Sequence, residues 1–217
     1  MSEAKVADPP ASSTGLRRRA ATRERLLDAA RVVLASEGFQ GASVEHICEQ
    51  AGFTRGAFYS NFSSKDELLL ALCHREREIM FDKLRAAADP STIADLDVSE
   101  AVRLILDRFL MLQPPDRDWF LVNAEFELRS VRDDEVGREF KAAWSQVKQE
   151  FQDLMVMILE ALGLRLTIDI HDAAVILMGT YDMALREALI ENRPMDPDLL
   201  RRVMPALLIS ATEPVAT

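Results

Sequence analysis

Apolar residues recur at helical spacing along almost the whole chain. The clearest early case has apolar residues at i, i+4, i+7 and i+8, which form one face of an α-helix: Leu26, Ala30, Val33 and Leu34. No stretch alternates apolar and polar residues in the way of a half-buried β-strand. The pattern therefore predicts an all-α protein with about nine helices.

Cap residues, glycines and prolines mark the expected ends of these helices. Ser64-Lys65-Asp66-Glu67 is a capping-box sequence, and Asp196-Pro197 puts a cap residue before a proline at the first helical position. Gly38 and Gly163 follow apolar helical stretches and suit a left-handed cap. The expected helices cover residues 18–38, 43–51, 54–61, 64–88, 97–112, 119–131, 134–162, 168–191 and 197–211.

A break at Asp89-Pro90-Ser91-Thr92 divides the chain, and the charge balance changes at the same place. Residues 17–88 are expected to form a small N-terminal domain with a connecting helix, and residues 91–213 a larger helical bundle. Residues 1–16, rich in Ala, Pro, Ser and Thr, predict a disordered tail.

The formal net charge of −10 would repel DNA if it were spread evenly. It is not: residues 17–65 carry eight Lys and Arg against five Asp and Glu, whereas residues 91–217 carry 13 against 23. The N-terminal domain can therefore face phosphates, and the rest of the chain should face away from them.

Other residue types narrow the class of protein. No run of 18 apolar residues could span a membrane and the N-terminus has no secretory signal, so a cytoplasmic protein is expected. Cys48 and Cys73 lie on apolar helical faces and are expected to be buried free thiols. The three histidines, His46, His74 and His171, form no zinc-ligand spacing with them, so neither metal nor cofactor is expected.

Two short helices joined by a glycine turn predict a helix-turn-helix motif over residues 43–62. The first helix is Ser43–Ala51, the turn is Gly52-Phe53 and the second helix is Thr54–Asn61. A serine at a helix N-terminus favours an anion, and glycine permits the positive φ of a tight turn. Because the second helix is small and polar on one side and carries phenylalanines on the other, it suits the major groove of DNA.

Four stretches follow one another in a dense pattern over about residues 20–75: TRERLLDAA (22–30), EGF (37–39), AGFTRGAFYSNF (51–62) and KDEL (65–68). Together they resemble the TetR family of bacterial regulators. The resemblance implies phosphate contacts for Ser43, Thr54, Tyr59 and Lys65, and base contacts for Val44, Arg55, Gly56 and Ala57. Asn61 is expected to contact either a phosphate or a base.

Arg55 is expected to be the main reader of bases, because Gly56 and Ala57 have no side-chain donors. Each assignment has an alternative. Tyr59 can be a packed aromatic residue, Lys65 a solvated residue of a first helical turn, and Arg55 a partner of a phosphate or of Glu49. Arg17-Arg18-Arg19 is either a solvated charge run or a basic arm for the minor groove.

The resemblance also implies that the C-terminal bundle binds a small ligand and dimerises. Bulky residues there are candidates for a pocket that takes a small hydrophobic or amphipathic effector, with ordinary core packing as the alternative: Trp119, Phe120, Phe126, Trp144, Met155, Met178 and Tyr181. Helices over about 168–191 and 197–211 are the expected homodimer surface, through small and apolar residues that include Ala173, Ala174, Leu177, Gly179, Met183, Ala184, Ala188 and Leu208.

These inferences predict a DNA-binding transcriptional regulator, most simply a repressor that binds a palindromic operator as a dimer and that a ligand releases. A ligand-independent DNA-organising protein and an activator of the same fold are the alternatives. A helical enzyme is a more distant one, because the sequence has no Ser/His/Asp set, no glycine-rich phosphate loop and no metal-ligand spacing.

Overall fold

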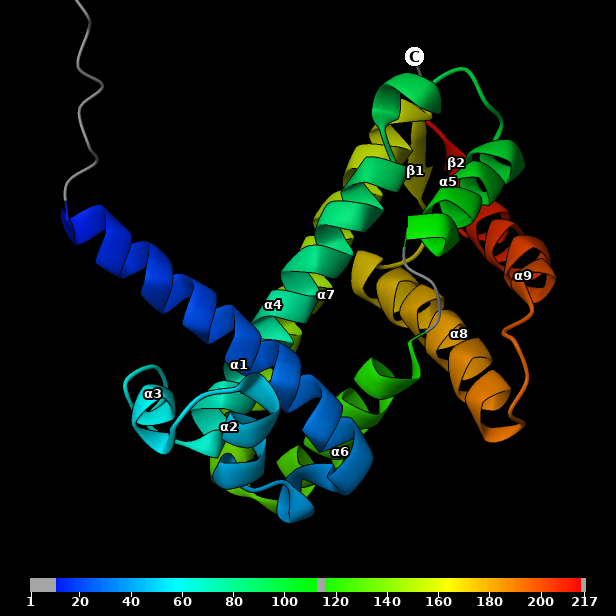
Figure 1. The fold of residues 1–217 in the computed structure, drawn as a ribbon. Coiled ribbons are helices and arrows are strands. Elements are labelled where there is room, and N and C mark those ends of the chain that lie inside the picture. The colour runs from blue at the N-terminus through cyan, green and yellow to red at the C-terminus, as the bar shows by residue number, and fades with distance from the viewer. Residues whose placement is uncertain (1–10, 113–115, 216–217) are drawn as a thin grey trace, which may run out of the picture. The chain divides into compact units, whose positions relative to one another are not determined.

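The computed structural model describes residues 11–112 and 116–215, so most of the predicted tail, residues 1–10, lies outside the described residues. The described residues form an all-α protein, as predicted, with a two-stranded sheet added (Figure 1). The helices are α1 (Ala11–Gly41), α2 (Val44–Ala51), α3 (Arg55–Tyr59), α4 (Lys65–Ala87), α5 (Val98–Leu112), α6 (Arg117–Arg132), α7 (Asp134–Ala161), α8 (Ile170–Ile190) and α9 (Pro197–Ser210), with a 3₁₀ turn at Pro90–Thr92.

The chain divides into two compact units, and the division differs from the predicted domains. The N-terminal unit contains residues 1–74 and 118–125, and the C-terminal unit contains residues 75–117 and 126–217. The division falls inside α4 and not at Asp89–Thr92, because the second half of α4 packs its apolar residues into the core of the C-terminal unit. Ala87, the last residue of α4, and Ala88 directly after it are fully buried beside Ile105 and Leu154.

The N-terminal unit is built on the apolar face that the sequence predicted for its first helix. Leu26, Ala30 and Val33 of α1 are buried with Ile47 of α2 and with Leu68 and Leu72 of α4. The helix is longer than expected: it begins at Ala11 where the sequence predicted Arg18, and it runs past Gly38 to Gly41. Gly38 has φ 71°, so the predicted left-handed conformation occurs there as a kink and not as an end.

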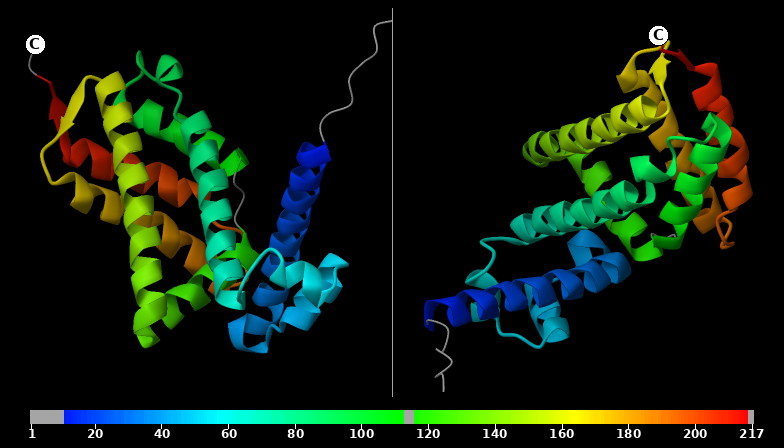
Figure 2. Two further views of the ribbon diagram at one scale, coloured as in Figure 1. Left: turned by 90° about the vertical axis from the view of Figure 1, so that its left-hand side faces the viewer. Right: turned by 90° about the horizontal axis from the view of Figure 1, so that it is seen from above.

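The C-terminal unit packs α5 against α9, α7 against α8 and α8 against α9. Two short strands that the sequence did not predict, β1 (Leu164–Leu166) and β2 (Thr212–Pro214), pair antiparallel beside this bundle (Figure 2). Three-residue strands show no alternation long enough to detect in a sequence. Gly163, with φ 65°, turns the chain from the end of α7 into β1.

The helix caps predicted from the sequence are present, but in one of them the glutamate side chain bonds to the residue before the expected one. Ser64 Oγ accepts a hydrogen bond from the Glu67 amide at 3.0 Å, as a cap should, but the Glu67 carboxylate returns to the amide and hydroxyl of Ser63. These two bonds lower the pKa of Glu67. Asp196 caps α9 as predicted, with Pro197 at its first position. No described helix is long and apolar enough to cross a membrane.

Candidate nucleic-acid interface and small-molecule cavity

The turn between α2 and α3 is fixed by a glycine and an arginine. Gly52 closes α2 with φ 71° and ψ 35°, and the Phe53 amide donates to the Cys48 carbonyl at 2.8 Å. Arg25 of α1 donates to the Ala51 carbonyl at 2.8 Å and lies over the ring of Phe53. No role was predicted for Arg25 from the sequence. A cation that donates to a carbonyl in the last turn of a helix, where no helix amide reaches, stabilises the end of α2.

The short helix α3 has one buried and one exposed side. Phe58 and Phe62, four positions apart, are almost completely buried, so they attach α3 to the core. Thr54, Arg55 and Gly56 are exposed, and Tyr59 keeps 51 % of its surface in solvent. Tyr59 is therefore not a packed core aromatic, although its ring meets the edge of Phe58.

The two predicted hydroxyl contacts, Ser43 and Thr54, are helix caps. Ser43 Oγ accepts from the His46 amide at 3.0 Å at the start of α2, and Thr54 Oγ1 accepts from the Ala57 amide at 3.3 Å at the start of α3. Both residues are exposed. Since a hydroxyl that accepts from an amide still has its own proton, each cap can donate to a phosphate oxygen.

Arg55 extends from the exposed side of α3 and pairs with Glu45 of α2, not with Glu49. Its Nη1 lies 2.7 Å from Glu45 Oε1, and its guanidinium carbon is 5.8 Å from the centre of the Tyr59 ring. A hydrogen bond that Arg55 donates to the Tyr59 oxygen, together with the Glu45 carboxylate, raises the pKa of Arg55, which stays charged. Glu45 thus orients the one long donor-rich side chain of this surface.

Lys65 has partners within the chain that the sequence did not predict. Its ammonium donates to the carbonyl oxygens of Phe39 and Ala42, the latter at 2.6 Å, and lies 4.2 Å from the centre of the Phe39 ring. These contacts join the start of α4 to the end of α1 and to the residue that follows it. Lys65 therefore has a structural role in the N-terminal unit, and its phosphate contact stays a prediction.

The remaining predicted contacts lie around α2 and α3. Val44 and Ala57 are half-buried, and the Asn61 amide nitrogen donates to the Ala57 carbonyl at 2.8 Å. A Cβ built on Gly56 meets only Thr54 Oγ1, at 3.7 Å, so the outer side of Gly56 is open. The basic run Arg17–Arg19 is part of helix α1 and not an extended arm, and Arg19 donates to the Ser60 carbonyl at the end of α3 at 2.9 Å.

The C-terminal unit contains a cavity of about 200 Å³. Helices α4, α5, α7, α8 and α9 contribute its walls, through apolar residues such as Phe81, Phe109, Leu154 and Met204. Among its described lining residues, only Tyr181, Asp182 and Thr212 have nitrogen or oxygen atoms in their side chains. Because an apolar engineered cavity of ~150 Å³ binds benzene, a cavity of this size and lining can take an apolar molecule.

Three of the seven predicted pocket residues line this cavity: Met155, Met178 and Tyr181. The other four do not. Phe126 and Trp144 belong to an aromatic stack around Phe140 on α6 and α7, with ring centres 5.2 and 6.1 Å apart. Trp119 and Phe120 belong to the N-terminal unit. The sequence missed the lining residues of α4 and α5, whose apolar spacing is that of any buried helix.

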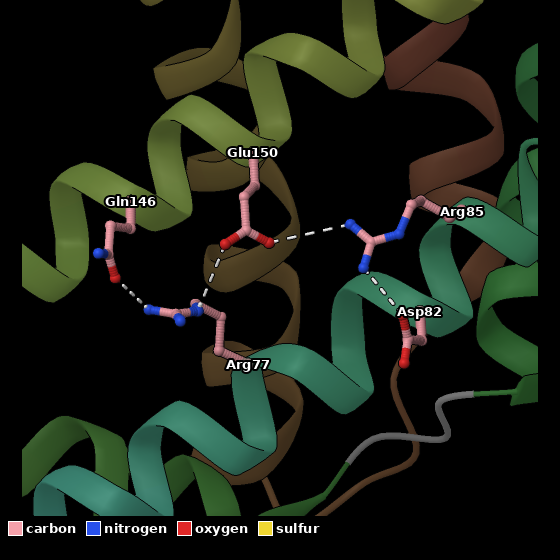
Figure 3. Close-up of polar contacts among 5 residues, drawn as sticks. All are labelled: Arg77, Asp82, Arg85, Gln146 and Glu150. Carbon is pink, nitrogen blue, oxygen red and sulfur yellow. Dashed lines mark hydrogen bonds and ion pairs between the residues drawn. The ribbon is translucent and has the colours of Figure 1, made fainter.

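A polar cluster beside the cavity joins α4 to α7 (Figure 3). Arg77 Nη1 donates to Gln146 Oε1 at 2.8 Å, and Arg77 Nε lies 3.6 Å from Glu150 Oε1. Glu150 also faces Arg85 at 3.9 Å, and Arg85 pairs with Asp82 at 2.8 Å. Glu150 is thus shared by two arginines of α4.

Comparison with known proteins identifies the region that contains α2 and α3. Residues 26–72 match the family described as bacterial regulatory proteins, tetR family. The transcriptional repressor AcnR of Corynebacterium efficiens is 30 % identical over 125 residues, 57 % of this chain and 56 % of AcnR. The regulator UidR of Escherichia coli K12 is 31 % identical over 88 residues, 41 % of this chain and 45 % of UidR. The chain thus spans about half the length of these relatives.

Solved structures share the fold over most of the chain. FadR of Bacillus subtilis, in complex with stearoyl-CoA, has a TM-score of 0.67 at 19 % identity and covers 86 % of this chain and 97 % of its own. A transcriptional regulator of Saccharomonospora viridis, in complex with choline, has a TM-score of 0.65 at 20 % identity and covers 89 % and 99 %. At these identities the similarity shows the all-α fold.

Proposed function

We propose that this chain, whose residues 26–72 match the tetR family of bacterial regulatory proteins, is a transcriptional repressor of that family that a small hydrophobic or amphipathic molecule releases from DNA. It binds a palindromic operator as a homodimer, with α3 of each protomer in the major groove. The exposed side of α3 carries the proposal, since it offers hydroxyl, guanidinium and phenol groups while Phe58 anchors the helix from behind.

The groups around α3 divide by chemistry into two roles. The cap hydroxyls of Ser43 and Thr54 and the phenol of Tyr59 donate to phosphate oxygens and set the position of the helix. Arg55 can donate to both major-groove acceptors of a guanine and so reads sequence. The bare surface at Gly56 allows the DNA to approach closely.

The apolar cavity favours a ligand-responsive regulator over a ligand-independent one. Its wall includes Met80, Phe81 and Leu84 of α4, the same helix that begins at Lys65 next to the segment before α2. A ligand that is bound more tightly in one arrangement of α4 than in another shifts the population of DNA-binding protomers. Neighbours of the same fold are complexes with stearoyl-CoA and with choline.

The outer surface of α8 supports the dimer. Ile176, Met183 and Ile190 are exposed and recur at spacing that puts them on one face of the helix. Most of the small residues that the sequence assigned to this role face the other way: Ala173, Ala174, Leu177, Ala184 and Ala188 are buried inside the protomer. The dimer surface is therefore the large apolar residues of α8, with Ile209 of α9 exposed as well.

Salt dependence of binding tests the DNA contacts. A palindrome selected from random DNA should bind with log K falling against log salt at a slope of roughly −5 to −7, if Lys and Arg side chains neutralise about three or four phosphates in each half-site. Tyr59→Phe should weaken binding to all sequences alike and leave the melting temperature unchanged, because the phenol is exposed. Affinity that does not respond to salt would contradict the proposal.

A further inference from the structure

Two of the three polar side chains on the cavity wall are neighbours in the chain. Tyr181 and Asp182 are adjacent on α8, and the Tyr181 ring meets the edge of Phe109 with centres 5.8 Å apart. Asp182 lines the cavity and is also exposed, so it stands where the cavity meets solvent. No other charged side chain is among the described residues that line the cavity.

The surroundings of Asp182 make its charge unfavourable when the cavity is empty. Desolvation by the apolar wall and the nearby carboxylate of Glu127 on α6 raise the pKa of Asp182 to about 6, against a smaller opposing effect of Arg186 one turn along α8. The same apolar wall raises the pKa of Tyr181 to about 12, so the phenol stays neutral. At neutral pH the cavity mouth therefore has a predominantly ionised carboxylate next to hydrocarbon.

The charge of the ligand decides how well it fits this mouth. An anionic ligand would add a third negative group beside Asp182 and Glu127. A neutral ligand would take water away from the carboxylate and offer it no new partner of opposite charge. A cation would pair with it by a charge-assisted hydrogen bond or ion pair, and the acidic C-terminal part of the chain favours its approach.

Resting on the proposed function, we infer that the effector is a lipophilic cation, with a hydrocarbon or aromatic body in the apolar cavity and one protonated amine or quaternary ammonium group at Asp182. The body supplies affinity by burying apolar surface against residues such as Phe81, Phe109 and Leu154. Asp182 supplies selectivity for charge.

Three ligands with the same alkyl chain test the charge preference: octylamine, octanol and octanoate. Calorimetric titration of the full-length protein without DNA should give the amine at least about tenfold tighter binding than the alcohol, and the carboxylate the weakest binding. Asp182→Asn should bring the amine to within about threefold of the alcohol and should not weaken binding of the alcohol, since no charge is then covered. Glu160→Gln, an exposed position on α7 next to the lining residue Leu159, is the matched control and should bind like the parent.

A pH series gives an independent readout. Octylamine remains protonated throughout, so its affinity should fall several-fold from about pH 7.5 to about pH 5, as Asp182 takes up a proton. Asp182→Asn should show no such fall. Stronger binding of the alcohol or of the carboxylate, binding of none of the three, or an amine preference that survives in Asp182→Asn would overturn the inference.

Release of DNA is measured separately, by fluorescence anisotropy of labelled operator with the same ligands. Tight binding of the amine without release would contradict the repressor mechanism and leave the ligand class standing. Release by the alcohol and the carboxylate as readily as by the amine would contradict the inferred ligand class and leave the repressor mechanism standing. The cavity would then control DNA binding without selecting for the charge of the ligand.

Discussion

At the residue scale, the candidate DNA surface depends on which partner each cation has in the folded chain. Arg25 and Lys65 are joined to backbone carbonyls of their own unit, whereas Arg55 reaches outward and pairs across the surface with Glu45. An exposed ion pair contributes ~0–1 kcal/mol to stability, so Arg55 can exchange Glu45 for a base at little cost. These three cations therefore differ in their partners and in their freedom to contact DNA, although the sequence shows each of them only as a basic residue.

Arg55→Ala should relax the base preference at one position of each half-site. The loss should be about 1–3 kcal/mol per half-site on the preferred operator and smaller on random DNA, because bidentate contacts to guanine carry sequence information. Selections on randomised half-sites with parent and variant measure this. The matched control is Arg18→Ala, an exposed cation of α1, which should lower affinity evenly across sequences. An unchanged preference in Arg55→Ala would assign Arg55 to the DNA backbone.

Lys65→Ala should destabilise the protein in the absence of DNA. Its ammonium donates to the Phe39 and Ala42 carbonyls, so truncation leaves those groups without their charged donor and should cost about 1–3 kcal/mol. Thermal and urea unfolding of the DNA-free protein measure this, again with Arg18→Ala as the control. A variant that unfolds like the parent but binds DNA weakly would return Lys65 to the phosphate contact that the resemblance implied.

At the element scale, α4 contributes to both units of the chain. Its first turn closes the N-terminal unit through Lys65, and its later turns line the cavity and pair with α7 through Arg77 and Arg85. Arg77 is only 12 % exposed, so its contact with Glu150 lies largely out of water, while the Arg85–Asp82 pair is exposed (Figure 3). The two pairs should therefore differ in energy.

Glu150→Ala should lower the stability of the protein by about 1–3 kcal/mol, since it leaves the half-buried guanidinium of Arg77 without its carboxylate. Asp82→Ala, which removes an exposed partner of Arg85, should change stability by less than ~1 kcal/mol. Urea unfolding of the two variants and of Arg77→Ala, arranged as a double-mutant cycle with Glu150→Ala, measures the coupling. Additive effects of Arg77→Ala and Glu150→Ala would show that the cluster does not hold α4 to α7.

At the scale of the whole molecule, the proposed function requires two copies of the chain. One helix-turn-helix contacts few bases, and a two-fold pair reads two half-sites about 34–36 Å or a multiple of this apart. The exposed apolar face of α8 is the surface proposed to bring the copies together. Large apolar side chains that lie exposed along one face of a helix are typical of a contact with another protein and not of a face that only water covers.

Met183→Asp should convert the dimer to a monomer, because it puts a charge at the centre of the exposed apolar face of α8. Sedimentation should then give half the mass, and affinity for the palindrome should fall at least about a hundredfold, since the half-sites are no longer bound together. Val131→Asp, at another exposed apolar residue on α6, is the control and should sediment like the parent. A dimeric Met183→Asp would move the interface away from α8.

The sequence by itself determined the helices of this protein and the place of its helix-turn-helix. Helix faces, caps and turn glycines act between residues one to four positions apart, so Ser43, Gly52 and the pair Phe58 and Phe62 could be read from spacing alone. The tetR-family pattern over residues 26–72 is local in the same sense.

Only the tertiary structure decided which side chains meet across the fold. Lys65 contacts a carbonyl 26 positions away, Arg77 a glutamine 69 positions away, and the cavity draws its walls from five helices. Trp144 and Met155 look alike as bulky apolar residues of α7, yet one stacks on Phe140 and the other lines the cavity. The spacing of residues along a helix fixes which face they share, but the element that covers that face depends on how distant segments pack, and packing is a property of the whole chain.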